Sequence, residues 1–366
     1  MVRVKVHGKK VSVKAKVKRK TARTTGPDYP RYLRGKDLIT TQEWEKKDLD
    51  VVLRTANEMK KNRFRHPLSQ SMYNKSFFMF FYNPSVRTRQ SFEVAATELG
   101  GHALFLEPGG MRLKTARTAG ETIEDAANVM SRYAAGIGIR ILEDKITYYG
   151  EGDQLLRDYA RWASIPVISM AHDKYHPCQG LSDIMALQNR LGDLKGKKAL
   201  LVWGKGALAR SWSSIQEFLL IASRFGMSIN VASPEGYDLD PDVMKNVKKN
   251  CDGNSQELKI THDMKEGYDN VHVVYSRNWM TPQAYRNSEF HKQEEIDKSL
   301  QYQEWICDAN KMKLTRNALF IHPMPVDRGN EVTDEVASGR NSVIYEIAEN
   351  RLHVQKAVMA LTMGDF

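Results

Sequence analysis

Lys75-Ser76-Phe77-Phe78-Met79-Phe80-Phe81-Tyr82 is followed by Asn83-Pro84 and then by Ser85-Val86-Arg87-Thr88-Arg89. The first run is aromatic and apolar, which is typical of a buried strand, and Asn-Pro ends such a strand. From Gln90 to Leu99 apolar residues recur at helical spacing. A helix N-terminus favours anions, and hydroxyls and guanidiniums placed there bind phosphate oxygens. The stretch therefore predicts a phosphate site, or alternatively a capped helix with two surface arginines.

Strands and helices alternate along the rest of the chain. Further strands are expected at 102–106, 136–140, 166–170, 198–203, 228–232, 271–275 and 318–321, and helices at 44–61, 121–134, 155–162, 215–225, 242–249 and 347–361. Such alternation predicts parallel sheets covered on both faces. A length of 366 residues predicts two domains. The expected fold class is α/β, with two doubly wound parallel-sheet domains.

The composition excludes several classes of protein. Three scattered cysteines, Cys178, Cys251 and Cys307, indicate a reducing cytoplasm rather than a disulfide scaffold. We find no metal-ligand spacing and no apolar stretch long enough to span a bilayer. Neither a metal nor a membrane is therefore expected.

The net charge of +11 is concentrated at the start of the chain. Residues 1–35 hold twelve Lys and Arg and one acidic residue, so the remainder is neutral overall. Valines alternate with basic residues on either side of His7-Gly8-Lys9-Lys10, which predicts a β-hairpin. The alternative is a basic arm that contacts RNA or acidic surfaces, although nucleic-acid contact is not the expected role. The segment has no apolar core of a secretory signal.

Polar clusters follow several of the predicted strands. Arg140 ends one strand, His176-Pro177-Cys178-Gln179 follows another, and His322-Pro323-Met324-Pro325 follows a third. Open parallel sheets bind ligands at the carboxyl ends of their strands. These clusters predict a cleft between two domains that binds an anion and polarises a group with a neutral histidine. Alternatively, His176 and His322 are structural and cap turns.

Six separated motifs resemble, in order and spacing, those of the aspartate/ornithine carbamoyltransferase family. They are Ser-x-Arg-Thr-Arg at 85–89, Gly-Glu-Thr at 120–122, Arg140, His-Pro-x-Gln at 176–179, His-Pro-x-Pro at 322–325 and Glu-Asn-Arg at 349–351. The resemblance covers residues 36 to 366. It implies a carbamoyl-phosphate domain, an acceptor domain, a terminal helix that returns to the first domain, and a homotrimer with shared active sites.

The resemblance also implies domain limits. After the basic extension 1–35, the carbamoyl-phosphate domain is expected at 36–185 and the amino-acid acceptor domain at 186–345. The returning helix is expected at 346–366. No cofactor is implied.

Roles carry over from the family residue by residue. The residues implied to bind carbamoyl phosphate are Ser85, Val86, Arg87, Thr88, Arg140, His176, Gln179, Met324 and Arg351. Arg140, His176 and Gln179 are the implied catalytic groups. Arg140 and His176 face the carbonyl oxygen, and Gln179 binds the amide. Donors at an oxygen that becomes an oxyanion typically accelerate such reactions by about 10²–10³.

The acceptor motifs of the family are missing. The Ser-Met-Gly loop of ornithine enzymes and the Arg-x-Gln-x-x-Arg motif of aspartate enzymes are both absent. Residues 275–279 are instead similar to the Trp-bearing loop of the N-acylornithine branch, which implies a trefoil-knotted acceptor domain. Candidate acceptor residues are Asn278, Trp279, Met324, Asp327 and Arg328. Alternatively, Trp279 is a core aromatic residue, and Asp327 and Arg328 form a surface ion pair.

One further departure lies before the Gly-Glu-Thr motif. The family has a lysine immediately before this motif, where Ala119 stands here. Lys114 or Arg117 of a neighbouring subunit is the candidate replacement.

The expected function is transfer of a carbamoyl group from carbamoyl phosphate to the amine of ornithine or an ornithine derivative, with aspartate as the alternative acceptor. A different class, an NAD-dependent dehydrogenase, is indicated by Gly204-Lys205-Gly206-Ala207-Leu208-Ala209 after a strand. That fingerprint needs an acidic residue roughly 20 residues on. The nearest candidate, Glu235, lies about 30 residues beyond Gly204.

Overall fold

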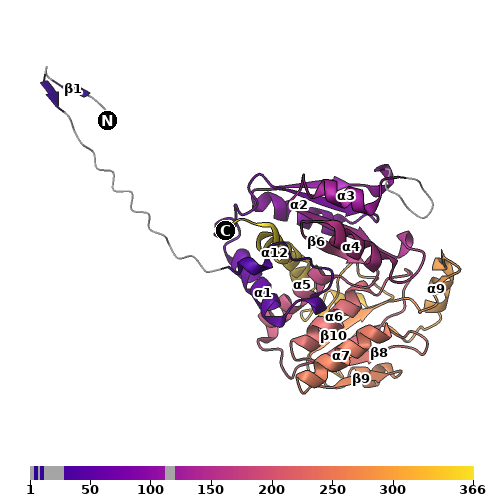
Figure 1. Cartoon of the computed structure of the whole chain (residues 1–366). Helices are drawn as coiled ribbons and strands as arrows, with labels where there is room; N and C mark the ends of the chain where they lie inside the picture. Colours follow the sequence, from indigo (N-terminus) through magenta and orange to yellow (C-terminus); the bar gives the residue numbers. More distant parts are fainter. Residues whose placement is uncertain (1–3, 7–8, 12–28, 112–119) are drawn as a thin grey trace.

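The computed structural model describes residues 4–6, 9–11, 29–111 and 120–366. Two lobes are visible in Figure 1, each built on one parallel sheet. One lobe contains α2, α3, α4 and β6, and the other contains α6, α7 and β8 to β10. Helices α5 and α12 lie between them.

The first sheet has four strands in the order β4-β3-β5-β6, and every neighbouring pair is parallel. Its strands are β3 (Ser76–Phe81), β4 (His102–Leu106), β5 (Gly136–Ile141) and β6 (Val167–His172). The helices of this part of the chain are α1 (Lys46–Lys61), α2 (Val86–Glu98), α3 (Ile123–Met130) and α4 (Glu151–Trp162).

Alternate side chains of β3 enter different cores, because successive residues of a strand point to opposite faces. Phe77 and Met79 belong to the large core that includes α1, α2, α5 and α12. Phe80 belongs to a second core, where it packs with Ile139 and with Tyr159 of α4. Both faces of the sheet are therefore covered, as the apolar run predicts.

The second sheet has five parallel strands in the order β13-β10-β7-β8-β9. Its strands are β7 (Lys198–Trp203), β8 (Ser228–Ala232), β9 (Leu258–Thr261), β10 (Val273–Arg277) and β13 (Leu319–Ile321). Its longer helices are α6 (Ser213–Arg224), α7 (Pro241–Gly253) and α9 (Lys292–Ser299). The short elements are α8 (Met264–Gly267), β11 (Tyr285–Arg286), β12 (Glu289–Phe290), α10 (Ala309–Met312) and α11 (Asp334–Ala337).

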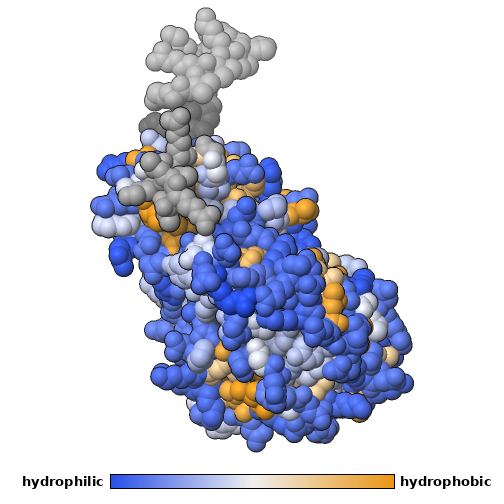
Figure 2. All heavy atoms as spheres, turned by 90° about the vertical axis from the view of Figure 1, so that its right-hand side faces the viewer, coloured by the Kyte–Doolittle hydropathy of each residue, from blue (hydrophilic) through white to orange (hydrophobic). Residues whose placement is uncertain are grey.

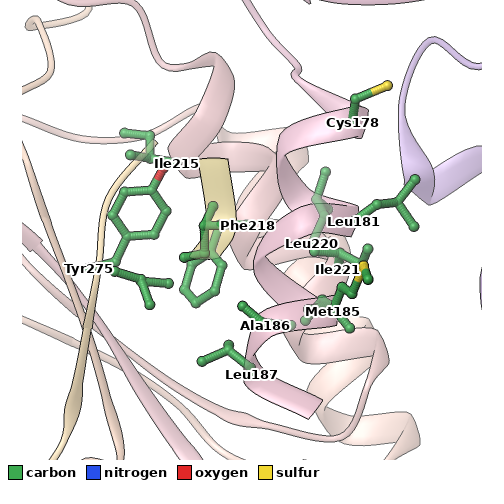
Figure 3. Close-up of a cluster of buried hydrophobic side chains, with 14 of the residues drawn as sticks. Cys178, Leu181, Met185, Ala186, Leu187, Ile215, Phe218, Leu220, Ile221 and Tyr275 are labelled. Carbon is green, nitrogen blue, oxygen red and sulfur yellow. The ribbon is translucent and has the colours of Figure 1, made fainter. Parts of the chain in front are cut away.

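Helix α5 (Pro177–Leu191) joins the two lobes. Every residue from Pro177 to Leu187 is buried. In Figure 3, Leu181 and Met185 of α5 lie beside Leu220 and Ile221 of α6. A helix that is enclosed on all sides cannot move separately from either lobe without opening the core.

Helix α12 (Ile344–Met363) ends the chain and packs on α1, α2 and α5. Its Lys356 is fully buried, with Nζ 2.7 Å from Glu98 Oε2 and 2.9 Å from the carbonyl oxygen of Arg63. The buried ammonium is therefore paired with a carboxylate of α2, which ties the end of the chain to the first lobe.

The predicted fold class of two doubly wound parallel-sheet domains is confirmed. Some boundaries differ from the prediction. Helix α2 begins at Val86, because Ser85 caps it through a side-chain bond from the Thr88 N–H. Helix α3 is shorter than the predicted 121–134, since Thr122 caps it and a turn follows Met130. The trefoil knot stays a prediction.

The basic extension contains a short antiparallel pair, β1 (Val4–Val6) with β2 (Lys9–Val11). The antiparallel pairing of the predicted hairpin is therefore present, but Lys9 and Lys10, which were expected in the turn, lie in β2. The remainder of the predicted second strand, 12–17, lies outside the described residues.

The surface shown in Figure 2 is mostly hydrophilic, with apolar residues in separate patches. Scattered patches of this kind are ordinary for a folded chain. Across residues 29–111 and 120–366, no helix combines the length and apolar character needed to cross a bilayer.

We expect Glu98→Ala to lower the free energy of unfolding by about 3 kcal/mol, because it leaves the Lys356 ammonium buried without a counter-charge. Urea denaturation measures this change. The double variant Glu98→Ala, Lys356→Met should recover most of the loss. Glu93→Ala is the control, since its exposed pair with Arg89 contributes about 0.5 kcal/mol or less. A double variant no more stable than Glu98→Ala would contradict the prediction.

Candidate active site

The turn after β3 contains two arginines, of which Arg89 is paired with a carboxylate. Arg89 Nε lies 2.9 Å from Glu93 Oε1, and its guanidinium covers Phe105 at 4.0 Å. Arg87 is half-buried, and among the described residues no carboxylate pairs with it. Burial, followed by the charge of Arg277, lowers the pKa of Arg87. The helix N-terminus therefore presents Arg87, and not Arg89, to the region between the lobes.

The other members of this turn surround the start of α2. Ser85 Oγ accepts from the Thr88 N–H at 3.4 Å, which is a long bond. Thr88 is buried, whereas Val86 is 70% exposed. The backbone at Val86 begins the helix, so its N–H is one of the groups without an intrahelical partner.

Arg140 lies near the carboxyl end of β5, where the register with β6 shifts by one residue. Bulges of this kind are frequent beside active sites. Its Nε is buried and has no partner among the described residues. Burial, followed by the charges of Arg351 and Arg87, lowers the pKa of Arg140 to about 10, against the opposing charge of Glu143. A buried guanidinium with other cations beside it favours an anion at this place.

His176 follows β6 and is the residue before α5. It is 7% exposed, and its Nδ1 has no partner among the described residues. Burial, followed by the charges of Arg351 and Arg140, holds its pKa well below the usual range. The imidazole is therefore neutral near pH 7 and retains one N–H to donate.

Gln179 and Arg351 come from α5 and α12 and meet in the core. Arg351 Nη1 donates to Gln179 Oε1 at 2.9 Å, and Gln179 Nε2 donates to Asp183 Oδ1 at 2.8 Å. Burial is the largest cause that lowers the pKa of Arg351 to about 10. The C-terminal helix thus brings a guanidinium to the start of α5.

The second lobe contributes an arginine that the sequence analysis did not select. Arg277 ends β10, is 7% exposed, and has both Nε and Nη1 without partners in the described part of the chain. Its charge lowers the pKa of Arg87, of Arg140 and of His176, so it faces the same region. The sequence did offer a signal for Arg277, since it is a positive residue at the end of a buried strand, as Arg140 is.

A buried carboxylate organises the loop that contains Met324. Glu331 Oε2 lies 2.7 Å from His322 Nε2, and Glu331 Oε1 accepts from the Asn278 N–H at 3.0 Å. The Met324 N–H donates to His322 Nδ1 at 2.9 Å. Arg210 Nη2 donates to the Pro325 carbonyl at 3.3 Å. Both ring nitrogens of His322 are thus bonded within the protein, and its role is to hold the loop that contains Met324.

The remaining acceptor candidates are engaged within the protein. Trp279 is fully buried and donates to the Tyr237 carbonyl, and Asn278 Nδ2 donates to the Gly204 carbonyl at 3.0 Å. Asp327 Oδ2 accepts from the Ala207 N–H at 2.8 Å. Arg328 forms an exposed pair with Asp334. None of these contacts is with the arginine cluster, which we define as Arg87, Arg140, Arg277 and Arg351.

The glycine-rich loop after β7 is not arranged for phosphates. The Lys205 and Gly206 N–H groups donate to the Trp305 carbonyl and to Ser299 Oγ. A dinucleotide fingerprint needs such N–H groups free at the start of a helix, and α6 begins only at Ser213. The geometry does not favour the dehydrogenase alternative.

Two further predictions concern ions and the loop before Gly120. Among the residues that the structure describes, no three His, Cys, Asp or Glu side chains are grouped to hold a metal ion. Ala119 and its candidate replacements Lys114 and Arg117 lie outside the described residues.

Two family models match the chain. Residues 36–189 match the carbamoyl-phosphate-binding domain, and residues 195–362 match the Asp/Orn-binding domain, of aspartate/ornithine carbamoyltransferases. The chain belongs to the aspartate/ornithine carbamoyltransferase family. The family predicted from the six motifs is confirmed, and with it the prediction of a carbamoyltransferase.

Curated relatives within this family cover nearly the whole chain. The chain is 36% identical to N-acetylornithine carbamoyltransferase of Xanthomonas campestris pv. campestris, over 90% of this chain and 98% of that protein. It is 35% identical to ornithine carbamoyltransferase of Thermococcus kodakarensis, over 91% of this chain and 98% of that protein.

Solved structures of this family have the same fold. Acetylornithine transcarbamylase complexed with acetylcitrulline matches with a TM-score of 0.83 at 35% identity, over 90% of this chain and 100% of that one. A variant of N-acetyl-L-ornithine transcarbamylase complexed with carbamyl phosphate and N-succinyl-L-norvaline matches with a TM-score of 0.82 at 35% identity. The match covers 89% of this chain and 99% of that one.

We expect the His176 imidazole to stay neutral throughout the pH range in which a free histidine gains its proton, because burial and the charges of Arg351 and Arg140 hold its pKa well below the usual value. NMR of ¹⁵N-labelled histidine measures the ring state, and His176→Gln identifies the signal. A titration of that signal near pH 6.5 would show that the ring is not held neutral.

Proposed function

We propose that this protein transfers the carbamoyl group of carbamoyl phosphate to the amine of an amino acid of the ornithine type and releases phosphate. The observation that carries the proposal is the arginine cluster around a neutral His176. Burial, together with the charges of neighbouring arginines, lowers the pKa of Arg87 and of Arg140, and an anion at this place would offset both effects. Carbamoyl phosphate supplies such an anion, together with a carbonyl group for the histidine to polarise.

Phosphate is held at the start of α2. The Ser85 and Thr88 hydroxyls and the Val86 N–H donate to its oxygens, and Arg87 binds it through its guanidinium. The positive end of the helix dipole adds to this attraction. These groups also stabilise the charge on phosphate as it leaves.

The carbamoyl group lies between α5 and β5. Arg140 and the neutral His176 donate to its carbonyl oxygen, which becomes an oxyanion when the amine attacks. Gln179 Oε1 and the Met324 carbonyl accept from its amide, and Arg351 completes the site. The neutral amine nitrogen bonds to the carbamoyl carbon, and the bond from that carbon to the phosphate oxygen breaks. The proton that the amine loses passes to the released phosphate.

The acceptor lies on the side of the second lobe. Arg277, at the end of β10, has two nitrogens without partners among the residues that the structure describes. Arg210 approaches from the same lobe, and its Nε is also buried without a partner in the described residues. We assign this pair to the carboxylate of the acceptor, since guanidiniums bind carboxylates in bidentate geometry. An ornithine-type amino acid carries that carboxylate at one end and the attacking amine at the other.

The proposal extends to the assembly. We expect a homotrimer in the cytoplasm, with domain limits at 36–185, 186–345 and 346–366. The family resemblance supports the homotrimer and the domain limits, and the three cysteines, which are buried and free, support a reducing compartment.

Arg87→Ala should weaken binding of carbamoyl phosphate at least a hundredfold, because a charge-assisted contact to phosphate is lost while the fold is retained. Isothermal calorimetry measures the binding. Arg89→Ala is the matched control from the same turn, and its affinity should stay within about twofold, because its guanidinium is paired with Glu93. Equal effects of the two substitutions would refute the phosphate site.

Transfer from labelled carbamoyl phosphate should be measured for ornithine, N-acetylornithine, N-succinylornithine, aspartate and putrescine. We expect product with an ornithine-type acceptor, and none with putrescine, which lacks a carboxylate. Arg277→Gln should raise the KM for the acceptor at least tenfold, and should weaken binding of carbamoyl phosphate by a smaller factor, because Arg277 contributes only part of the charge of the cluster. Efficient carbamoylation of putrescine would overturn the carboxylate assignment, and absence of carbamoyl-phosphate binding would overturn the proposed activity.

A further inference from the structure

A buried carboxyl group stands behind Gln179, one turn further along α5. Asp183 is fully buried, and its Oδ1 accepts from Gln179 Nε2 at 2.8 Å. Its Oδ2 has no partner in the described residues. An apolar residue at this position would pack in the core without the cost of burying a carboxyl group. Asp183 is therefore placed for its contact with Gln179 and not for packing.

The amide of Gln179 is held at both ends. Arg351 Nη1 donates to its oxygen, and Asp183 Oδ1 accepts from its nitrogen. Exchange of oxygen and nitrogen would direct the amide N–H groups at the guanidinium and the amide oxygen at the carboxyl group. The two contacts therefore permit one orientation of the amide, in which oxygen is at the Arg351 end.

This orientation matters for recognition of the carbamoyl group. A carbonyl oxygen has two lone pairs, so Gln179 Oε1 accepts from Arg351 and retains one lone pair. That lone pair accepts from an N–H of the substrate. Acetyl phosphate has the same phosphate and carbonyl groups but a methyl group in place of the amide nitrogen, so it cannot make this contact.

We propose that Asp183 is a positioning residue that fixes the amide of Gln179 and thereby makes the site prefer carbamoyl phosphate to acyl phosphates without an amide nitrogen. The inference rests on the proposed function. Burial raises the pKa of Asp183 to about 8, but either protonation state of the carboxyl group retains an oxygen that accepts from Gln179 Nε2.

The test compares three ligands by calorimetry: carbamoyl phosphate, acetyl phosphate and inorganic phosphate. Asp183→Leu removes the acceptor and should weaken carbamoyl phosphate about tenfold, the loss of roughly one hydrogen bond. Binding of acetyl phosphate and inorganic phosphate should change less than twofold. Asp183→Asn keeps a carbonyl oxygen and should restore the preference for carbamoyl phosphate.

Two controls separate positioning from damage to the helix. Ser182→Ala removes the neighbouring buried hydroxyl, which donates to the Cys178 carbonyl, and should leave the preference unchanged. In a double-mutant cycle, Gln179→Met should abolish the preference, and adding Asp183→Leu should weaken binding no further. If Asp183→Leu shows no cooperative melting transition, Asp183→Ala takes its place with the same expected result.

Failure of the positioning role of Asp183 can be distinguished from failure of the proposed carbamoyl transfer. Equal weakening of all three ligands, or an unchanged preference in Asp183→Leu, overturns the positioning role while carbamoyl transfer by the wild-type protein stands. Independent, additive effects of Gln179→Met and Asp183→Leu also overturn it. A wild-type protein that does not bind carbamoyl phosphate overturns the proposed function itself.

Discussion

Burial of helix α5 between the two lobes is the constraint on which the rest of the molecule depends. From Pro177 to Leu187 the helix has no exposed residue, and it contacts α1, α6 and α12. His176 immediately precedes the helix and Gln179 and Asp183 lie in its first two turns, so these side chains are fixed by the same packing that joins the lobes. Displacement of α5 would disturb the core and the site together, which is the rigidity that an oriented set of donors needs.

Four arginine charges lie close together at the junction of the lobes, and their mutual repulsion opposes the stability that packing provides. Arg87 and Arg140 come from the first sheet, Arg277 from the second and Arg351 from the last helix. Burial and the neighbouring guanidiniums lower the pKa of Arg87 and of Arg140, so these charges destabilise the unliganded protein. An anionic ligand relieves this repulsion, so part of its binding free energy comes from charges that were already in place. Proteins commonly accept such a local cost where function requires it.

Much of the fold could be predicted from local pattern. The aromatic run of β3 has side chains in two cores, as an apolar strand covered on both faces requires. The positions of Ser85, Arg140 and His176 at strand ends follow from the rule that parallel sheets bind ligands there. Arg277 satisfied the same rule, but the prediction selected Trp279, two residues further on, whose side chain lies in the core. Sequence spacing cannot tell which of two neighbouring residues faces the site, because the turn after the strand decides it.

The position of Arg351 has a consequence for biosynthesis. This residue lies in the last helix of the chain, and its guanidinium contacts Gln179, which lies 172 positions earlier. During synthesis each lobe has its strands before α12 leaves the ribosome, and domains commonly fold as they emerge. The partly made chain would then have two folded lobes, an open groove on α1, α2 and α5, and an incomplete ring of cations. The proposed site is therefore complete only when the last helix is added, and a chain that lacks α12 also leaves the apolar surfaces of α1, α2 and α5 uncovered.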